Sequence, residues 1–302
     1  GWIPINDDDV TDAPFKGNQE GIFGFGYDGS SYVSMTNLVS NAGVVATDTT
    51  GVGTDRKNLA ACEYGGDKGI FGYGYDGSNS VSMTNLVSNA GVVATDVTGV
   101  GTARHKLAAC SYGEDKGIFG FGDDGSSVVG MTNLVSNAGV VATDVTAVGT
   151  ARKSPAACEY GEDKGIFGFG KTGSYSDITN LVSNAGVVAT DVTGVGTARQ
   201  TLAACGYGYD KGIFGFGHTG SAVGMTNLVS NAGVVASDVS AVGTARYSLA
   251  ATQYGGDKGI FGYGDTGSAS SLSNLVSNAG VVASDVTGVG TARDGIAACS
   301  FN

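Results

Sequence analysis

The sequence predicts an all-β protein made of six copies of one antiparallel unit. The motif Gly-Ile-Phe-Gly, followed by an aromatic residue and a glycine, begins at Gly21, Gly69, Gly117, Gly165, Gly212 and Gly259. The spacings are 48, 48, 48, 47 and 47 residues, and a period in the forties corresponds to one repeated supersecondary unit. Glycine and aromatic residues return at fixed positions, and no stretch has a helical period.

Residues 59–106 contain one complete unit. Strands are predicted over 59–64 and 69–74, with a turn between them, and the second strand is expected to place Phe71 and Tyr73 on one face. A turn-rich loop over 75–78 leads to a strand over 83–88. The tripeptide that follows, Asn-Ala-Gly, is typical of a hairpin loop with glycine in the left-handed conformation.

A fourth strand is predicted over 92–98, which is rich in β-branched residues, and the connection over 99–106 leads to the next unit. Four short antiparallel strands with glycine and aromatic residues at fixed positions are typical of a propeller blade. The sequence therefore predicts a six-bladed β-propeller with four-stranded antiparallel blades.

The chain begins and ends at different points of the unit. The first copy starts at the strand over 21–26, and the last copy ends with a strand over 296–302. We expect this C-terminal strand to complete the N-terminal blade and close the ring, because an open array would need distinct capping repeats. Residues 1–20 are predicted to be an N-terminal extension, and residues 21–302 a single, monomeric propeller.

The composition argues against several classes of partner. The formal net charge is -12, with 16 Lys and Arg against 28 Asp and Glu, whereas nucleic-acid phosphates require a basic surface. No apolar run approaches the roughly 20 residues of a membrane span. Residues 1–18 lack the pattern of a signal peptide, although export stays open. We therefore expect neither a nucleic-acid nor a membrane partner.

The five cysteines share one position of the unit, and Thr252 takes this position in the remaining copy. An odd number at one position is a poor disulfide framework, so buried free thiols are predicted, with metal or redox chemistry as the alternative. The cysteines are Cys62, Cys110, Cys158, Cys205 and Cys299.

Each unit also has one aspartate in its fourth strand and one arginine before its first. The simplest interpretation is structural, with Asp–Arg pairs or Arg-to-carbonyl bonds joining the blades, and the alternative is six contacts to an anion or a sugar. The arginines are Arg56, Arg104, Arg152, Arg199, Arg246 and Arg293, and the aspartates are Asp48, Asp96, Asp144, Asp191, Asp238 and Asp285.

The sequence gives little indication of a catalytic or metal-binding site. The Asp-Gly-Ser sequence of the first three 75–78-type loops is compatible with calcium, but later copies replace it with Lys171-Thr172 and His218-Thr219, which supply fewer oxygen ligands. The chain has only two histidines, and no nucleophile–base pair is visible. We expect no enzyme activity, no metal and no cofactor.

The differences between copies point to a binding face. They concentrate in the 75–78 loop, in the 99–106 connection and in their copies. Because successive strands alternate in direction, these two varied segments are expected at the same end of the sheets. The loops at the opposite end are predicted to be nearly uniform in sequence. Loops on a rigid scaffold commonly bind ligands, and drift in unconstrained loops is the alternative. The candidates are Lys57, Tyr75, His105, Lys106, Lys153, Lys171, Gln200, His218 and Tyr247.

Two resemblances are recognisable over 21–302. The Arg-x-x-Leu-Ala-Ala segment, followed by a turn and Lys-Gly-Ile-Phe-Gly, resembles the kelch repeat, although the adjacent glycines and late tryptophan of kelch repeats are missing. The amino-acid sequence of the repeats is also similar to that of propellers encoded by bacteriophages, which are tail-associated, and to environmental viral sequences. This implies a virion tail protein that binds a host-surface glycan or protein, or other virion proteins.

Three functions remain open from the sequence. The first is a non-enzymatic binding or structural propeller, and basic residues on the varied face of an acidic protein favour an anionic partner such as an acidic polysaccharide. The second is a lectin with repeated sugar sites, which the irregular positions of Tyr27, Tyr75, Tyr175 and Tyr247 disfavour. The third is a propeller enzyme with its site at the ring mouth.

Overall fold

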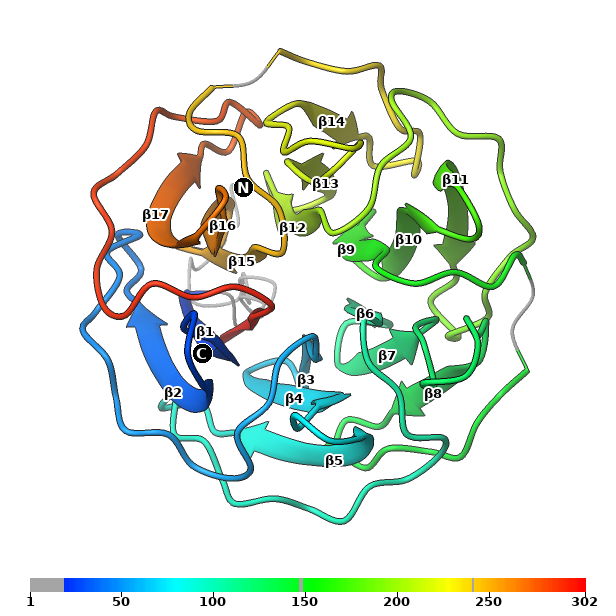
Figure 1. The fold of residues 1–302 in the computed structure, drawn as a ribbon. Coiled ribbons are helices and arrows are strands. Elements are labelled where there is room, and N and C mark those ends of the chain that lie inside the picture. The colour runs from blue at the N-terminus through cyan, green and yellow to red at the C-terminus, as the bar shows by residue number, and fades with distance from the viewer. Residues whose placement is uncertain (1–18, 147–148, 241) are drawn as a thin grey trace, which may run out of the picture.

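The computed structural model describes residues 19–146, 149–240 and 242–302, and within them all regular structure is β (Figure 1). Six three-stranded antiparallel sheets form a β-propeller-like repeat fold. In chain order, the sheets are β18 (Ala297–Phe301), β1 (Glu20–Tyr27) and β2 (Tyr32–Val39); β3 (Ala60–Tyr64), β4 (Lys68–Tyr75) and β5 (Ser80–Val87); β6 (Ala108–Tyr112), β7 (Lys116–Gly120) and β8 (Thr132–Val135); β9 (Ala156–Tyr160), β10 (Lys164–Lys171) and β11 (Tyr175–Val182); β12 (Ala203–Tyr207), β13 (Lys211–Gly215) and β14 (Thr226–Val229); and β15 (Ala250–Tyr254), β16 (Lys258–Asp265) and β17 (Ala269–Val276).

We number these sheets one to six in that order. The described residues contain no helix that is long and apolar enough to span a membrane.

The prediction of a fourth strand over 92–98 is wrong, because this segment makes only two isolated bridges to β5, Val87↔Val93 and Thr84↔Val97. Between these bridges the outer segment has one residue more than β5, so the ladder bulges. The Asn85 side chain fills the gap by donating from Nδ2 to the Ala94 carbonyl at 3.0 Å and to Asp96 Oδ1 at 2.9 Å. The same two bridges recur in all six units.

A bulge also corrects the expected faces of the central strands. The register of β4 against β5 shifts between Gly72 and Gly74, where Tyr73 has a φ of 63°. Tyr73 therefore turns with Ile70 toward the third sheet, whereas Phe71 packs toward the first. Each central strand therefore packs one aromatic ring against each of its two neighbouring sheets. In the gap between the second and third sheets, the ring centroids of Tyr73 and Phe119 are 5.2 Å apart.

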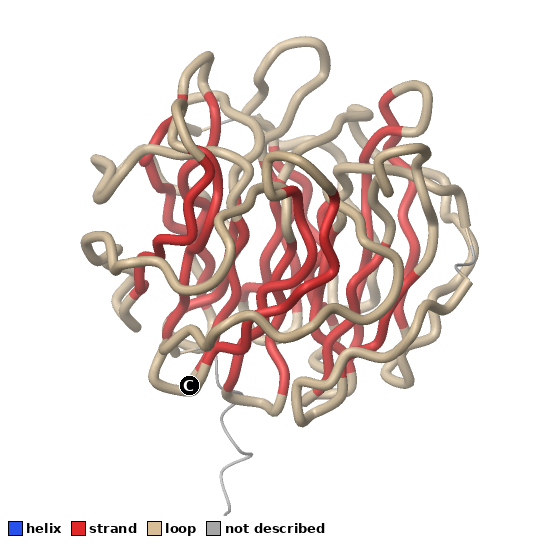
Figure 2. The backbone as a smooth tube through the Cα atoms, turned by 60° about the horizontal axis from the view of Figure 1, so that its bottom comes forward, coloured by secondary structure: helices blue, strands red, loops and turns tan. Residues whose placement is uncertain are grey.

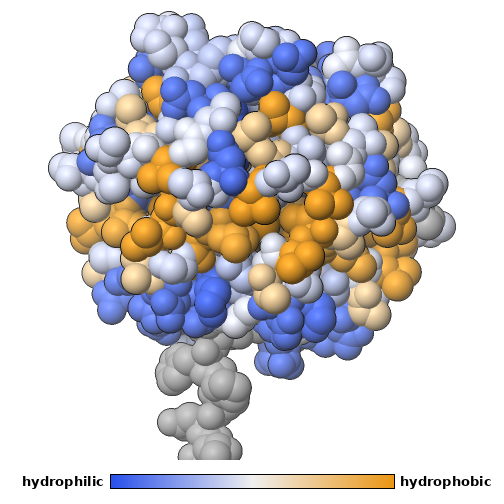
Figure 3. Space-filling model, turned by 90° about the horizontal axis from the view of Figure 1, so that it is seen from below, coloured by the Kyte–Doolittle hydropathy of each residue, from blue (hydrophilic) through white to orange (hydrophobic). Residues whose placement is uncertain are grey.

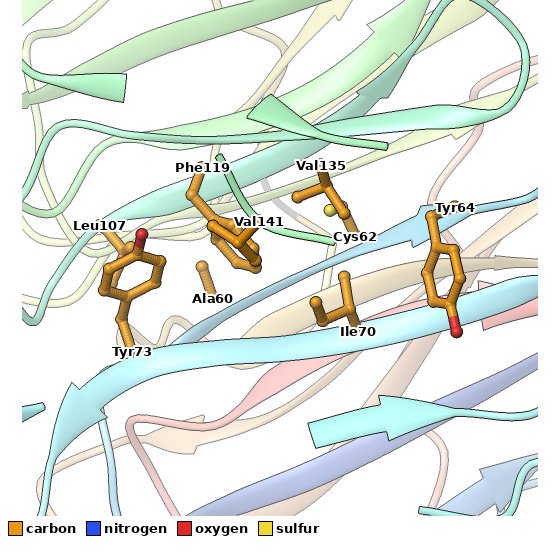
Figure 4. Packing of buried hydrophobic residues seen from close by; sticks show 9 residues of the cluster. All are labelled: Ala60, Cys62, Tyr64, Ile70, Tyr73, Leu107, Phe119, Val135 and Val141. Atoms are coloured by element: carbon orange, nitrogen blue, oxygen red, sulfur yellow. The ribbon is translucent and has the colours of Figure 1, made fainter. Parts of the chain in front are cut away.

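The hydrophobic core is divided among the gaps between sheets. In the gap between the second and third sheets, Ile70 and Tyr73 of β4 face Phe119 of β7 and Val135 of β8 (Figure 4). Gly72 makes this approach possible, because a Cβ there would lie 2.6 Å from Phe119 Cζ. Close packing of this kind fixes the spacing between neighbouring sheets.

The first strand of each unit lies nearest the centre (Figure 1). These inner strands contact one another in the order β3, β6, β9, β12, β15 and β18, and β18 in turn contacts β3. The C-terminal strand β18 pairs with β1 from Glu20↔Phe301 to Gly24↔Ala297. The two ends of the chain therefore contribute to one sheet.

The loops separate into two faces, which Figure 2 shows from the side. The 75–78 loop and its copies lie with the 99–106 connections and their copies, because the two are bridged by pairs such as Lys57↔Tyr75 and His105↔Asp123. We call this end the loop face. The opposite end, the turn face, holds the remaining turns, where Asn137 Nδ2 donates to Asp115 Oδ2 at 3.0 Å.

On the side of the molecule seen in Figure 3, a hydrophobic band crosses the rim between these two faces. It consists mainly of valines from the outer segments, and one valine in each unit is 64–66% exposed. These residues are Val44, Val92, Val140, Val187, Val234 and Val281.

Candidate functional site: a pocket on the central axis

A buried arginine anchors each connection on the loop face. Arg104 has no exposed surface; its Nε donates to the Phe121 carbonyl at 2.9 Å and its Nη2 to Asn133 Oδ1 at 2.7 Å. Its guanidinium lies 4.2 Å from the ring centroid of Tyr73 in the preceding sheet. Burial lowers the pKa of Arg104, while Tyr73 and Asp144 raise it. All six arginines are 0% exposed, so an external anion or sugar cannot reach them.

The repeated aspartates complete this anchor. Asp144 Oδ2 accepts from Thr102 Oγ1 at 2.7 Å, and Thr102 in turn gives its carbonyl to Arg104 Nη1. Five arginines lie 3.5–3.9 Å from their aspartates: Arg56–Asp96, Arg104–Asp144, Arg199–Asp238, Arg246–Asp285 and Arg293–Asp48. Thr150 links the sixth pair, Arg152 and Asp191, through hydrogen bonds to both. We infer that all twelve residues hold the connections in place.

Two residues beyond each arginine, the backbone forms hydrogen bonds around the axis. The Lys106 N–H donates to the Asn58 carbonyl at 2.8 Å, and the Ser154 N–H donates to the Lys106 carbonyl at 2.7 Å. The series continues through Thr201, Ser248 and Gly295 and returns when the Asn58 N–H donates to the Gly295 carbonyl at 2.7 Å. All six residues have φ between 53° and 62°. We call this circle of six residues, from Asn58 to Gly295, the floor, and it is held together by backbone hydrogen bonds.

Above this floor lies a pocket of about 440 Å³. Seven of the nine candidate residues line it: Lys57, Tyr75, His105, Lys106, Gln200, His218 and Tyr247. Asn58, Thr201, Ser248 and Asp294 complete the lining. The volume falls in the range of about 300–1,000 Å³ that is typical of small-ligand sites. The varied positions of five of the six units thus converge on one cavity, which we call the axial pocket.

Lys153 and Lys171 do not line the axial pocket. Lys153 Nζ lies 2.7 Å from Asp123 Oδ2, which neutralises its charge. Lys171 Nζ lies 5.2 Å from the ring centroid of Tyr175. Burial alone would raise the pKa of Asp123, but the hydrogen bond from Lys153 and that from the Gly125 N–H bring it below the ordinary value. These two lysines therefore belong to the surroundings of the pocket.

Aromatic rings form two groups at the mouth. Tyr32 packs between Tyr27 and Tyr75, and Tyr75 packs on His105 with centroids 5.5 Å apart. In the second group, His218 lies between Tyr175 and Tyr247, 5.1 Å from the ring of Tyr247. Such surfaces can stack against the apolar face of a ring-shaped ligand.

Charges are distributed unevenly around the axial pocket. Lys106 is half-buried, and no carboxylate of the described residues lies within ion-pair distance of its ammonium. Burial lowers the pKa of Lys106, and nearby Lys153 lowers it further. Burial also lowers the pKa of His105, whose Nδ1 shares a hydrogen bond of 2.9 Å with Ser80 Oγ. Burial and Asp265 raise the pKa of Asp294.

Below the floor the axis becomes apolar and then narrow. Leu59, Leu107, Leu202 and Leu249 are 5–6% exposed and, with Pro155 and Ile296, surround a cavity of about 70 Å³. The five cysteines lie further down, free and buried, and Cys62 Sγ fits against Gly117 of the neighbouring sheet. Burial raises the pKa of Cys205 to about 12.

The prediction of a nearly uniform turn face is wrong at two positions. One lies in the turn after the first strand, where the copies have Gly66, Glu114, Glu162, Tyr209 and Gly256. The residue after each cysteine position also differs between copies and lines a cavity of about 60 Å³ at the lower end of the axis. These residues are Glu63, Ser111, Glu159, Gly206, Gln253 and Ser300. Comparing all positions of the unit, rather than the loops alone, would have found this variation.

Four lining residues were missed among the candidates although they lie in the compared segments. Asp294 has the same position in its unit as Lys57, and Asn58, Thr201 and Ser248 share the position of Lys106. Their repeat position was the signal that could have identified them.

The Asp-Gly-Ser loops have a local explanation. Asp28 Oδ1 accepts hydrogen bonds from the Ser30 and Ser31 N–H groups at 2.8 and 2.7 Å, and Asp76 and Asp124 cap their own turns in the same way. Over the described residues, no three His, Cys, Asp or Glu side chains gather as a metal site would require. The carboxylates therefore act as turn caps.

No model of a known protein family matches the chain, and no curated protein is similar enough to count as a relative. The functional argument therefore rests on the axial pocket and on the repeat pattern.

Proposed function

We propose that this protein is a closed six-bladed propeller that acts as a non-enzymatic binding module, with one ligand site on its axis. The observation that supports this most strongly is the convergence of seven varied side chains on the axial pocket. If these positions had only drifted, they would have no reason to combine aromatic rings, ammonium groups and uncharged polar groups around one cavity of ligand size. The hydrogen bonds that return from Asn58 to Gly295 support ring closure.

The ligand we propose is one end or one branch of a host-surface glycan. Five of the six units contribute to the axial pocket, and they do so with different side chains, for example Lys57, Gln200 and Tyr247 at the same repeat position. Six equal sugar sites would require equal contacts, so a single asymmetric ligand fits this arrangement better than the repeated sites of a lectin. A location in a virion tail rests on the resemblance of the repeats to bacteriophage propellers and remains a proposal.

Binding stoichiometry tests the proposal directly. A glycan array would select ligands, and isothermal titration calorimetry of the best ligand should give one site per chain. Replacing Tyr247 by Ser should weaken binding at least about tenfold, because it removes a stacking surface. Six sites per chain, or binding that is unaffected by Tyr247→Ser, would contradict a single axial site.

A matched control keeps the interpretation specific. Lys116→Gln changes a lysine of the turn face that is paired with Asp115 at 2.6 Å and lies outside the axial pocket. This variant should bind as the wild type does. If Lys116→Gln abolishes binding and Tyr247→Ser does not, the binding surface is the turn face.

A further inference from the structure

We propose that the axial pocket selects a carboxylate-bearing sugar, such as a uronic acid at the end of an oligosaccharide, with its carboxylate held between Lys57 and Lys106. This inference rests on the proposed function and names the chemistry of its ligand. It is drawn from the two lysines, from Asp294 near Lys57 and from the uncharged groups around them.

Lys57, Lys106 and Lys171 are the described lysines with no carboxylate within ion-pair distance, and of these three Lys57 and Lys106 line the axial pocket. Five turn-face lysines and Lys153 have a carboxylate within 2.8 Å. Lys57 instead extends over two tyrosine rings, with its Nζ 4.5 Å from the centroid of Tyr27 and 5.5 Å from that of Tyr32. Lys106 belongs to the floor, where its N–H donates to the carbonyl of Asn58, the residue after Lys57. A ligand anion would supply the partner within ion-pair distance that Lys57 and Lys106 lack among the described residues.

The net charge of the axial pocket fits a singly charged group. Lys57 and Lys106 contribute two positive charges, while His105 is biased toward the neutral form by burial. Asp294, close enough to interact electrostatically with Lys57, contributes one negative charge when ionised. The sum of about +1 complements a carboxylate better than a phosphate dianion, which would carry a charge of about -2.

The remaining lining suits the rest of a sugar. Asn58, Gln200, Thr201 and Ser248 offer amide and hydroxyl groups to the ring hydroxyls. Tyr247 and His218 offer ring surfaces on the sheets that lie across the axis from Lys57 and Lys106. A sugar that stacks there can direct its carboxylate toward the two lysines, and a cavity of about 440 Å³ has room for a mono- or disaccharide.

The test compares three disaccharides on the full chain by calorimetry: one ending in glucuronic acid, its glucose counterpart and the 6-O-sulfated glucose form. We expect the glucuronic acid form to bind about tenfold more tightly than the glucose form, with an advantage that shrinks as salt is added. Equal affinities, or a preference for the sulfated form, would overturn the carboxylate assignment.

Two substitutions introduce residues that other units already have at the same repeat position, so they should preserve the fold. Lys57→Gln copies Gln200, and Lys106→Asn copies Asn58, which has nearly the same φ of 56°. Each should remove the preference for the acid, so that the affinities of the variant for the acid and glucose forms agree within about twofold. Lys106→Arg should retain the preference, and Lys116→Gln should have no effect.

The outcomes separate the two proposals. If the glucose form binds and Tyr247→Ser abolishes that binding, but the acid has no advantage, the axial pocket stands as the binding site and the carboxylate assignment fails. If no disaccharide or array glycan binds, or if all binding survives Tyr247→Ser, the proposed function fails and this inference fails with it.

Discussion

Two neighbouring positions of the repeat, the arginine and the residue after it, have opposite patterns. The arginine is identical in six copies and fully buried, as Arg104 shows. The next residue is Lys57, His105, Lys153, Gln200, Tyr247 or Asp294, and each is partly exposed. One peptide bond therefore separates a structural position from a position that we propose for recognition. Because the buried arginine and its aspartate partner hold the backbone of the connection, the residue beside the arginine is free to differ between units.

The strongest test of this contrast is Arg104→Met. The change leaves the Phe121 carbonyl and Asn133 Oδ1 without their buried donor, and breaking a buried charged network typically costs about 3–5 kcal/mol. We expect a loss of that size in the free energy of unfolding, measured with urea. His105→Gln, one residue away, is the control and should cost about 1 kcal/mol or less. Equal losses from both variants would remove the distinction between the positions.

A second test concerns the packing that supports the arginines. In Gly72→Ala the new Cβ would lie 2.6 Å from Phe119 Cζ, in the gap between the second and third sheets. Overpacking of this kind should lower the free energy of unfolding by about 1–3 kcal/mol. Gly173→Ala is the control, because no atom lies within 4 Å of the position of its added Cβ. A stable Gly72→Ala protein would mean that the gap between sheets can widen without cost.

The third prediction uses Asp294, the recognition residue with a raised pKa. Burial raises this pKa above its ordinary value. As the pH rises, Asp294 therefore loses its proton at a lower pH in the unfolded chain than in the folded protein. The contribution of Asp294 to stability is complete below about pH 4 and is lost as the pH passes through the folded-state pKa. In Asp294→Asn this loss is absent, so the variant should gain stability relative to the wild type between about pH 4 and pH 7. Urea unfolding across this range would show a constant difference if the carboxyl is not desolvated.

The smallest effect is expected for Lys57→Gln. The repeat already accepts Gln200 at this position, next to a buried arginine. The free energy of unfolding should change by no more than about 0.5 kcal/mol, as measured by urea unfolding at neutral pH. A loss above 2 kcal/mol would show that recognition positions also support the fold.

The sequence was sufficient to predict the parts of the fold that local patterns determine. The six units, the three inner strands of each unit and the common side of the varied loops all follow from the repeat and from strand alternation. The faces of Phe71 and Tyr73 were not predictable by period two, because the bulge at Tyr73 requires a positive φ in an aromatic residue. The outer strand was overestimated because β-branched residues do not reveal that the Asn85 side chain interrupts the ladder.

The candidate site was predicted in its residues but not in its shape. Comparing the copies identified Lys57 and Tyr247, yet nothing in the sequence indicated that six connections would bond to one another around the axis. That contact depends on residues such as Ser154 and Thr201 having positive φ, which their residue types do not signal. Lys153 was separated from the axial pocket by its pairing with Asp123, a contact between adjacent loops.

The circle of backbone hydrogen bonds beneath the axial pocket has an electrostatic consequence. Each N–H points to the next carbonyl around the axis, from Lys106 to Asn58 and on through Gly295. Peptide dipoles arranged head to tail in a closed circle cancel, whereas the parallel dipoles of a helix add together. The floor therefore imposes no sign on the potential above it. Exchange of a few side chains such as Lys57 or Asp294 should therefore be enough to turn the anion preference that we propose for the axial pocket into a preference for cations.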